Sequence, residues 1–581
     1  MIKNFFISIS KILNSLNREQ INRLYILFFL ILISVGLETL SIGLIVPVIS
    51  FVLDPKSLSQ NVFFNFLFND YQIKYLIYIL IIFISLIFIL KNLFLIFLNW
   101  FQNKKLNMIS LELSQKLYKV YTNSSYEFHT KVDKSVIYNN VLHITTFITG
   151  LESLVLLIAE FMILSGILII LLYFEFIGTI IIIFVFAISS CLIFFFTSKP
   201  LAKWGELNFR FAEKKIKSVV QVFTGIKEIK LLNKHNYFYE QFSSNEKKDL
   251  EVNNKVKIIN LIPRLSFEII FLLSIFSFLF YKFKTDFVSS GVISILALYA
   301  AAFFRILPSI SRIISYANRI INISKIIAEI NQEIQSLEKK SFYTHEKENN
   351  LANTKVITFS KTLKIENISY QYNLRTRKIF NELNLIINFG EKIGIIGETG
   401  SGKSTLVNIV TGLLKPNKGN ILVDESNIQE NILNWQKQIG YVAPETFIIN
   451  DTIKKNIALG ISEEKIDKEK LKKVIEIAEL NKFIDNLPLK DNTKIGEQGS
   501  EISSGQRQRI GIARALYVKP KLLILDEATS SLNVEIENKI LKKLECFDKE
   551  LTIISISHRD SALINCDRIF KLNNGNLVNI K

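Results

Sequence analysis

The sequence predicts two kinds of structure in one chain: a membrane α-helical region with six spans, followed by an α/β domain of the P-loop type. Two observations carry this prediction. Six apolar runs are each long enough to cross a bilayer, which takes about 20 residues of helix. Further along, a glycine-rich turn separates a strand-like run from a helical run. We therefore predict an N-terminal amphipathic helix, a six-helix transmembrane domain, a linker and a nucleotide-binding domain, at residues 1–20, 21–325, 326–360 and 361–581.

Composition supports a membrane protein. The chain has 581 residues, 49% of them hydrophobic, a mean hydropathy of +0.30 and a formal net charge of +18. The basic residues mostly flank apolar runs or lie in the C-terminal domain, so a cytoplasmic bias of loop charge and contact with anionic membrane lipids explain them better than nucleic acid. No nucleic-acid partner is expected. Three isolated cysteines predict no disulfide framework.

The apolar runs fix the expected membrane topology. They lie at about 22–53, 75–100, 147–173, 176–197, 257–282 and 288–312. Lysine and arginine concentrate between runs two and three and between runs four and five, which places both stretches in the cytoplasm. The N-terminus and the C-terminal domain then also face the cytoplasm. The two inner stretches are long and read as helices that continue out of the membrane.

Two further segments are expected to lie at the membrane surface. Residues 2–16 have apolar side chains at helical spacing and suit an amphipathic helix on the inner leaflet, or a plain solvated N-terminus. The outer loop at 54–74 contains the apolar stretch 61–68. This stretch suits a short helix on the outer leaflet, or packing against the ends of the spans.

The glycine-rich turn reads GETGSGKST and fits the phosphate-binding pattern G-x-x-x-x-G-K-[ST]. Its backbone N–H groups and the following helix start would face phosphate oxygens. Lys403 would reach the β- and γ-phosphates of ATP, and Ser404 would hold Mg²⁺. The predicted ATP-binding residues here are Gly397, Glu398, Thr399, Gly400, Ser401, Gly402, Lys403, Ser404 and Thr405.

Partner motifs follow at suitable distances. A strand-like run ends in Asp526, expected to bind Mg²⁺, and Glu527, expected to polarise the attacking water. The stretch 502–510 resembles the LSGGQ-type signature of ABC ATPases. By the same resemblance, His558 stands at the switch histidine and Tyr372 at the aromatic residue that stacks on adenine. It implies that a partner chain's signature, at Ser503, Ser504, Gly505 and Gln506, completes each ATP site.

Three positions depart from the ABC pattern. Pro444 stands where a glutamine is expected, Ser504 replaces a glycine of the signature, and Asn533 ends the D-loop in place of aspartate. The neighbouring Glu445 is hypothesised to supply a replacement oxygen to the metal. Hydrolysis is still expected, because the lysine, the two acids and the histidine are all present.

Charged residues inside apolar runs usually face a cavity or a partner, because exposing them to lipid is costly. Arg264 and Glu268 are four residues apart on one helix and could simply pair. The sharper hypothesis is that Lys91, Arg264 and Arg305 line a cavity that attracts an anionic headgroup, since arginine suits phosphate. Glu38 and Glu160 also lie in or near these runs.

The membrane half resembles PglK-type lipid-linked oligosaccharide flippases, within the type IV exporter architecture of ABC transporters. The matching segments are 36–43 with Pro47, 225–230, Pro263-Arg264 and Arg305-Ile306-Leu307-Pro308. The resemblance implies a multi-pass homodimer in the bacterial inner membrane that moves a polyprenyl-pyrophosphate glycan outward. It also implies short coupling helices near 126–129 and 222–225, which contact the ATPase domains.

Two other functions stay open. An exporter of another lipid, a peptide or a drug would have the same motifs. A non-transport ABC ATPase is disfavoured, because six apolar runs are fused to an intact pair of acids.

Overall fold

The computed structural model describes residues 2–43, 73–174, 176–285, 290–349, 356–372, 378–496, 499, 501–559, 561 and 563–581. The chain divides into two compact units. The first contains residues 1–124 and 131–342. The second contains Ser125–Thr130 together with Tyr343–Lys581. Ser125–Thr130 is the segment that includes the first expected coupling helix, and it forms the helix α6, Tyr126–Lys131.

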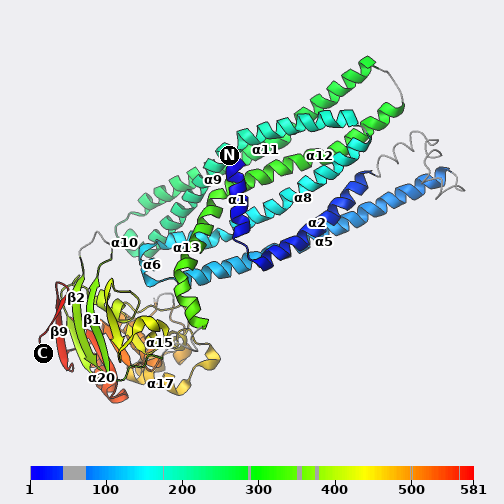
Figure 1. Cartoon of the computed structure of the whole chain (residues 1–581). Coiled ribbons are helices and arrows are strands. Elements are labelled where there is room, and N and C mark those ends of the chain that lie inside the picture. Colours follow the sequence, from blue (N-terminus) through cyan, green and yellow to red (C-terminus); the bar gives the residue numbers. More distant parts are fainter. Residues whose placement is uncertain are drawn as a thin grey trace. The chain divides into compact units, whose positions relative to one another are not determined.

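The first unit is built of long helices that run side by side (Figure 1). α2 lies against α5 and α8, α9 lies against α11, and α12 lies against both α8 and α9. The helices outside α6 are α1 (Ile2–Asn14), α2 (Arg18–Gly43), α5 (Ile73–Thr122), α7 (Lys134–Leu142), α8 (Ile144–Phe174), α9 (Phe176–Thr224), α10 (Ile226–Leu231), α11 (His235–Thr285), α12 (Ser290–Asn322) and α13 (Ser324–Asn349).

Six of these helices overlap the six expected spans, and four of them are apolar enough over their described residues to cross a membrane. These four are the stretches Arg18–Ser41, Ile81–Thr122, Lys134–Tyr173 and Ile183–Thr224. The spans assigned to α11 and α12 rest on the sequence, so the count of six stays a prediction. The expected outer-leaflet helix at 61–68 lies outside the described residues.

Three helices are much longer than a bilayer needs. α5, α9 and α11 have 50, 49 and 51 residues. At about 1.5 Å per residue each is roughly 75 Å long, against a hydrocarbon core of about 30 Å. The expectation that the inner stretches are helices continuing beyond the membrane is therefore confirmed as secondary structure.

The interior of the first unit is apolar where α8, α11 and α12 meet. Ile167, Phe267 and Ile306 are buried in one cluster. The predicted N-terminal helix exists as α1, and its Ile12 is fully buried. The Nδ2 of Asn331 on α13 donates to the backbone oxygen of Lys11 at 2.7 Å. One face of α1 is thus fixed by packing on α13, while Phe6 remains exposed.

α13 runs on to Asn349, so most of the stretch expected as a linker is helical. Its lysine, glutamate and glutamine residues favour helix. The polar composition that suggested a linker is equally suited to an exposed helix.

The second unit carries two sheets. The antiparallel one has the order β2-β1-β4-β5, from Phe380–Asn388, Thr362–Tyr370, Lys418–Val423 and Ser426–Asn427. The larger one has the order β10-β9-β3-β8-β7-β6, from Asn576–Asn579, Arg568–Asn573, Lys392–Ile396, Thr552–Ile556, Leu522–Asp526 and Ile439–Val442. It is parallel from β9 to β6, with β10 antiparallel at its edge.

Two apolar clusters hold this unit together. One contains the side chains of β1, β2 and β3 with Trp435, whose Nε1 donates to the oxygen of Val410 at 2.8 Å. The other contains side chains of β6, α17 and α19.

The α-helices of the second unit, apart from α6, are α14 (Lys403–Val410), α15 (Ile432–Gln436), α16 (Ile453–Ile457), α17 (Lys468–Ile477), α18 (Asn481–Asp485), α19 (Ser504–Tyr517) and α20 (Val534–Phe547).

Candidate ATP site and charged groups of the helical unit

The glycine-rich turn connects β3 directly to α14, as its sequence pattern predicts. Gly400 and Gly402 have φ angles of +84° and +108°, which favour glycine. A Cβ on Gly402 would lie 2.8 Å from the Cγ2 of Ile379, so space also excludes a side chain there. The turn therefore places the free N–H groups of the α14 start where phosphate oxygens can bind.

Lys403 is almost buried beneath this turn. Its Nζ donates to the backbone oxygens of Gly397 at 2.7 Å and Glu398 at 3.1 Å, and lies 3.3 Å from the Nε2 of His558. The ammonium group is thus held by turn carbonyls, close to where the phosphates are expected. The predicted switch histidine is brought to the P-loop lysine from 155 positions away.

The two acids follow β7, whose neighbour β8 lies between it and β3. The carboxyl ends of these parallel strands meet at one edge of the sheet, so residues that follow them converge. The Oε1 of Glu527 lies 3.4 Å from the Nε2 of His558. Glu527 has a φ of +50°, and its N–H donates to the oxygen of Ile556 at 2.9 Å. The strained backbone directs this carboxylate to the histidine side of the site.

Asp526 is buried and accepts a hydrogen bond from the hydroxyl of Tyr441 at 3.2 Å. Burial raises the pKa of Asp526 above its usual value, and the charge of Glu527 raises it further, while the Tyr441 hydrogen bond and Lys403 oppose this. Carboxylate and hydroxyl oxygens suit Mg²⁺, so Asp526 and Ser404 fit the metal by their chemistry. A bound divalent cation would favour the ionised carboxylate.

Tyr441 is a site residue that the sequence did not single out. It lies on β6, three residues before the unusual Pro444. Burial first, and then the charge of Asp526 and the hydrogen bond to it, raise the pKa of Tyr441, with a smaller effect from Tyr126 of α6. Glu445 is exposed. Within the described part of this segment, Tyr441 supplies the hydrogen bond to Asp526, whereas metal binding by Glu445 stays a hypothesis.

The expected adenine-stacking residue lies next to the P-loop helix. The Tyr372 hydroxyl is 3.2 Å from the Oγ1 of Thr405, and its ring meets Tyr370 edge to face at 5.2 Å between centroids. Its side chain is partly exposed. The ring therefore lies after β1 and beside α14, at the rim of the turn.

The signature stretch begins α19. Ser503 is the N-cap and forms a capping box with Gln506, in which each side chain accepts from the other residue's backbone N–H, at 3.2 and 2.8 Å. Ser504, the departure from glycine, is the first helical residue and is exposed, as is Ser503. The departure thus occupies ordinary helical backbone, where a serine needs no unusual φ angle.

The D-loop, residues 530–533, is held from two sides. Gln508 of α19 accepts from the N–H of Ser531 at 3.0 Å and donates to the Oγ of Ser530 at 3.2 Å. Arg559, next to the switch histidine, donates to the backbone oxygens of Ser530 at 2.6 Å and Leu532 at 3.0 Å. Asn533 caps α20 by accepting from the N–H of Ile536 at 2.8 Å, so this departure keeps the role of a cap.

We predict that Arg559→Ala lowers the turnover number for ATP by about ten- to hundredfold, because small displacements of catalytic groups lower reaction rates by factors of about that size. The reason is that Arg559 holds the loop that follows Glu527. The affinity for ATP should stay close to wild type, and Arg559→Lys should recover part of the rate. Turnover and nucleotide affinity, measured separately, check this; an unchanged turnover number in Arg559→Ala would contradict it.

The three expected cavity cations occupy different surroundings. The Nε of Arg264 lies 3.1 Å from the Oε1 of Glu268, which is the simple pairing considered for them, and the arginine side chain remains 69% exposed. Lys91 lies over the ring of Phe88 at 4.6 Å. Arg305 lies 2.5 Å from the Oε1 of Glu38, on α2. Among the described residues, no hydrogen bond or ion pair joins the three to one another.

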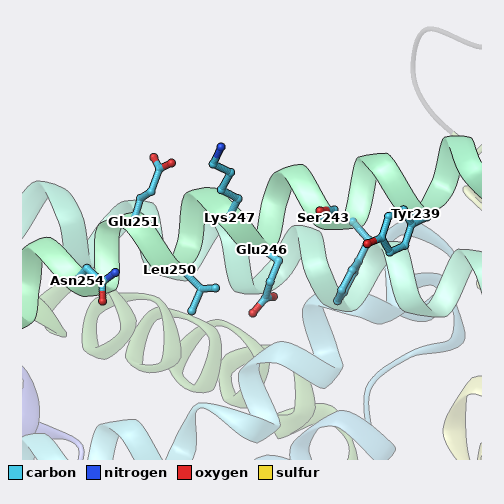
Figure 2. A pocket seen from close by; sticks show the side chains of 8 residues that line it. Tyr239, Ser243, Glu246, Lys247, Leu250, Glu251 and Asn254 are labelled. Atoms are coloured by element: carbon cyan, nitrogen blue, oxygen red, sulfur yellow. The ribbon is translucent and has the colours of Figure 1, made fainter.

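One cavity of about 370 Å³ runs along α11. Figure 2 shows that the labelled lining residues belong to this single helix, with Lys247 and Glu251 directed away from Glu246 and Leu250. A space lined by one helix is a surface groove rather than a chamber. It holds none of the cations predicted to line a substrate cavity.

The fold and the site define a class: a helical unit, with four helices among its described residues apolar enough to cross a membrane, joined to an α/β unit whose P-loop lysine, acid and histidine lie together. Residues 380–530 match the sequence profile of the family described as ABC transporter. The whole fold is similar to a solved bacterial Atm1-family ABC exporter with ATP bound, with a TM-score of 0.81, 19% identity, and coverage of 97% of this chain and 95% of that one. At this identity the likeness shows the fold.

Curated relatives match over part of the chain. An ATP-dependent lipid A-core flippase of Ralstonia nicotianae is 37% identical over 218 residues, 37% of each chain. The leukotoxin export ATP-binding protein LtxB of Aggregatibacter actinomycetemcomitans is 38% identical over 232 residues, 40% of this chain and 32% of that protein. A putative multidrug export ATP-binding/permease protein of Staphylococcus aureus is 37% identical over 215 residues, 37% of each chain. The match spans about a third of the length of these relatives.

Proposed function

We propose that the protein is an ATP-driven exporter of the bacterial inner membrane that works as a homodimer, and that its substrate is an anionic lipid-linked molecule, a polyprenyl-pyrophosphate glycan. The observation that carries the first part is the convergence of Lys403, Glu527 and His558 at the carboxyl edge of the larger sheet. The described residues of the same chain include four helices long and apolar enough to cross a membrane. Hydrolysis and membrane passage are then functions of one polypeptide.

The arrangement assigns each side chain a step. On ATP binding, Lys403 exchanges its carbonyl partners for the β- and γ-phosphates. Glu527 accepts a hydrogen bond from the attacking water and orients it, and His558, within reach of both Lys403 and Glu527, contacts the γ-phosphate. Mg²⁺, held by Ser404 and Asp526, would neutralise the charge that develops on the phosphate oxygens. Tyr441 keeps the Asp526 carboxylate oriented for this.

A second copy of the chain would complete each ATP site. The exposed Ser503 and Ser504 leave the signature end of α19 free to meet a partner's nucleotide. The expected second coupling region supports a partner as well. Around α10, the side chains of Phe223, Leu231 and Leu232 are 67–72% exposed. Large apolar side chains gathered in this way mark an interaction surface, and we propose that the partner's ATPase domain covers it.

The first coupling segment points to the chain's own ATPase domain. Ser125–Thr130 is grouped with the ATPase unit, although the residues before and after it belong to the helical unit. A movement of this segment would therefore act on the ATPase unit with which it is grouped. We propose this as the path by which hydrolysis drives the helices.

The substrate class rests on the charged residues of the helical unit. Arg264 keeps most of its surface exposed despite its pairing with Glu268, so its remaining N–H groups can bind a phosphate oxygen. The relatives are named for lipid, toxin and drug export, so their names do not single out one substrate. If Glu38 stays paired with Arg305 throughout transport, the neutralised arginine favours the second candidate, an exporter of a less charged lipid, peptide or drug.

The test is the ATPase activity of purified protein in lipid nanodiscs with and without a polyprenyl-pyrophosphate glycan. We expect the glycan lipid to stimulate turnover severalfold, and Arg264→Ala to weaken the stimulation. The matched control is Arg210→Ala, because Arg210 is also an exposed arginine paired with a glutamate four residues away. Activity that ignores the glycan lipid but responds to another amphiphile would support the second candidate.

A further inference from the structure

Four charged side chains from three helices meet inside the helical unit. Glu38 lies on α2, Glu160 on α8, and Arg305 and Arg312 on α12. The Nε of Arg305 lies 2.5 Å from the Oε1 of Glu38, and its Nη1 lies 4.0 Å from the Oε2 of Glu160. The Nε of Arg312 lies 2.6 Å from the Oε1 of Glu160. The cluster holds two negative and two positive charges and is formally neutral.

The two acids are held unequally. Both oxygens of Glu160 contact Arg312: Oε1 lies 2.6 Å from the Nε, and Oε2 accepts a hydrogen bond from Nη2 at 3.3 Å. Glu38 pairs with Arg305 through one oxygen, and its other oxygen, Oε2, is buried without a hydrogen-bond partner among the described residues. The Glu38 side chain is only 7% exposed. A buried carboxylate oxygen without a donor is costly, so Glu38–Arg305 is the weaker link of the cluster.

We propose that Glu38 is the internal counter-ion of Arg305 in the substrate-free protein, and that the anionic group of the substrate replaces it. This inference rests on the proposed function. An arginine presents five N–H donors in a planar fork that matches a phosphate group better than it matches one carboxylate oxygen. Glu160 and Arg312 stay paired, which keeps α8 joined to α12. The exchange breaks the tie between α2 and α12 alone.

The replacement of Glu38 by the substrate's anionic group couples substrate binding to a movement of α2. Glu38, once displaced, is a buried charge without a partner, so α2 has to shift until the carboxylate reaches water. The packing next to it is close: a Cβ on Gly166 of α8 would lie 2.3 Å from the Cγ2 of Thr39. A shift of α2 therefore has to be a movement against α8 as well. A neutral substrate could not compete for Arg305, so Glu38 also gives the site its preference for anions.

The test compares Glu38→Gln with wild type in nanodiscs, with polyprenyl pyrophosphate as the probe. We expect the concentration that gives half-maximal ATPase stimulation to fall about tenfold in Glu38→Gln, within the usual range of such couplings. ATPase activity without lipid should rise, because α2 is already released. The control is Glu206→Gln, which removes the charge from an exposed pair with Arg210 on α9. It should change neither quantity.

A double variant with the two charges exchanged distinguishes an effect on substrate binding from an effect on folding. Glu38→Arg combined with Arg305→Glu keeps an ion pair between α2 and α12 and should retain the melting temperature better than Arg305→Glu alone. It should nevertheless lose stimulation by polyprenyl pyrophosphate. Polyprenol and inorganic pyrophosphate are run beside the probe, so that stimulation by free pyrophosphate identifies a soluble anion as the ligand.

The outcomes are distinct. If wild type responds to the probe and Glu38→Gln shows the same half-maximal concentration, the counter-ion role is overturned while the proposed function stands. If wild type fails to respond to any polyprenyl pyrophosphate, the proposed substrate fails. A melting temperature that the charge exchange leaves as low as that of Arg305→Glu alone would show that the pair does not join α2 to α12, which overturns the inference by itself.

Discussion

Glu527→Gln is expected to lower the ATPase rate of the purified protein by about 10²- to 10⁴-fold, the usual contribution of a general base. Glutamine keeps the shape of the side chain and the unusual φ of +50° at this position, but it cannot accept the proton of the attacking water. ATP binding should persist, because Lys403 and the glycine-rich turn are unchanged. Phosphate release and nucleotide binding, measured on the same preparation, test this directly.

Glu535→Gln is the matched control for this prediction. Glu535 lies in the first turn of α20, eight residues further on, and is exposed and paired with Lys539. Its replacement should leave the rate within a factor of about two, because exposed ion pairs contribute little. Loss of ATP binding in Glu527→Gln, or a rate close to wild type, would contradict the role assigned to Glu527.

Lys403→Ala is expected to weaken ATP binding by about 2–5 kcal/mol, the usual cost of removing one partner of a buried charge pair. Lys403 is the nearly buried cation of the turn, and its ammonium group lies among the Gly397 and Glu398 oxygens and His558. The change corresponds to a rise in Kd of more than tenfold, since about 1.4 kcal/mol is a factor of ten. Equilibrium binding of a fluorescent ATP analogue measures it.

Lys415→Ala serves as the control for charge and for purification, because Lys415 is exposed in the loop that follows α14. Its Kd for the analogue should match wild type. A Lys403→Ala protein that binds the analogue as tightly as Lys415→Ala, with an unchanged melting temperature, would show that the phosphates bind elsewhere.

Most of the ATP site could be predicted from the sequence because its determinants are local. The turn needs glycine at Gly402, where φ is +108°, and such a requirement is visible in the sequence. The acids Asp526 and Glu527 follow an apolar strand-like run, so their place at the end of a buried strand was predictable as well. The long helices were predictable for a similar reason, since the length of an apolar run sets the span of a helix.

The partners of these residues were not predictable in the same way. Tyr441 and Asp526 are 85 positions apart and meet because β6 and β7 are neighbours in the sheet. Arg559 reaches the D-loop because the end of β8 lies beside the end of β7. Neither contact has a spacing that a motif could record, and Tyr441 on a strand reads as an ordinary aromatic residue.

In the predicted linker, composition did not identify the secondary structure. The polar composition of residues 326–360 suggested a linker, yet α13 continues to Asn349. Lysine and glutamate favour an exposed helix as readily as they favour a solvated linker. Composition therefore did not separate the two.

The sequence by itself determined the order of the two units, the P-loop, the two acids and the switch histidine, because each depends on residue type at short range. Only the tertiary structure decided which partner each charged side chain has and how far that side chain is exposed. Arg264 and Arg305 look alike in the sequence, but one is paired along its own helix at 69% exposure and the other is paired across helices with a buried glutamate. The physical reason is that an ion pair between helices depends on their packing, which no local pattern specifies.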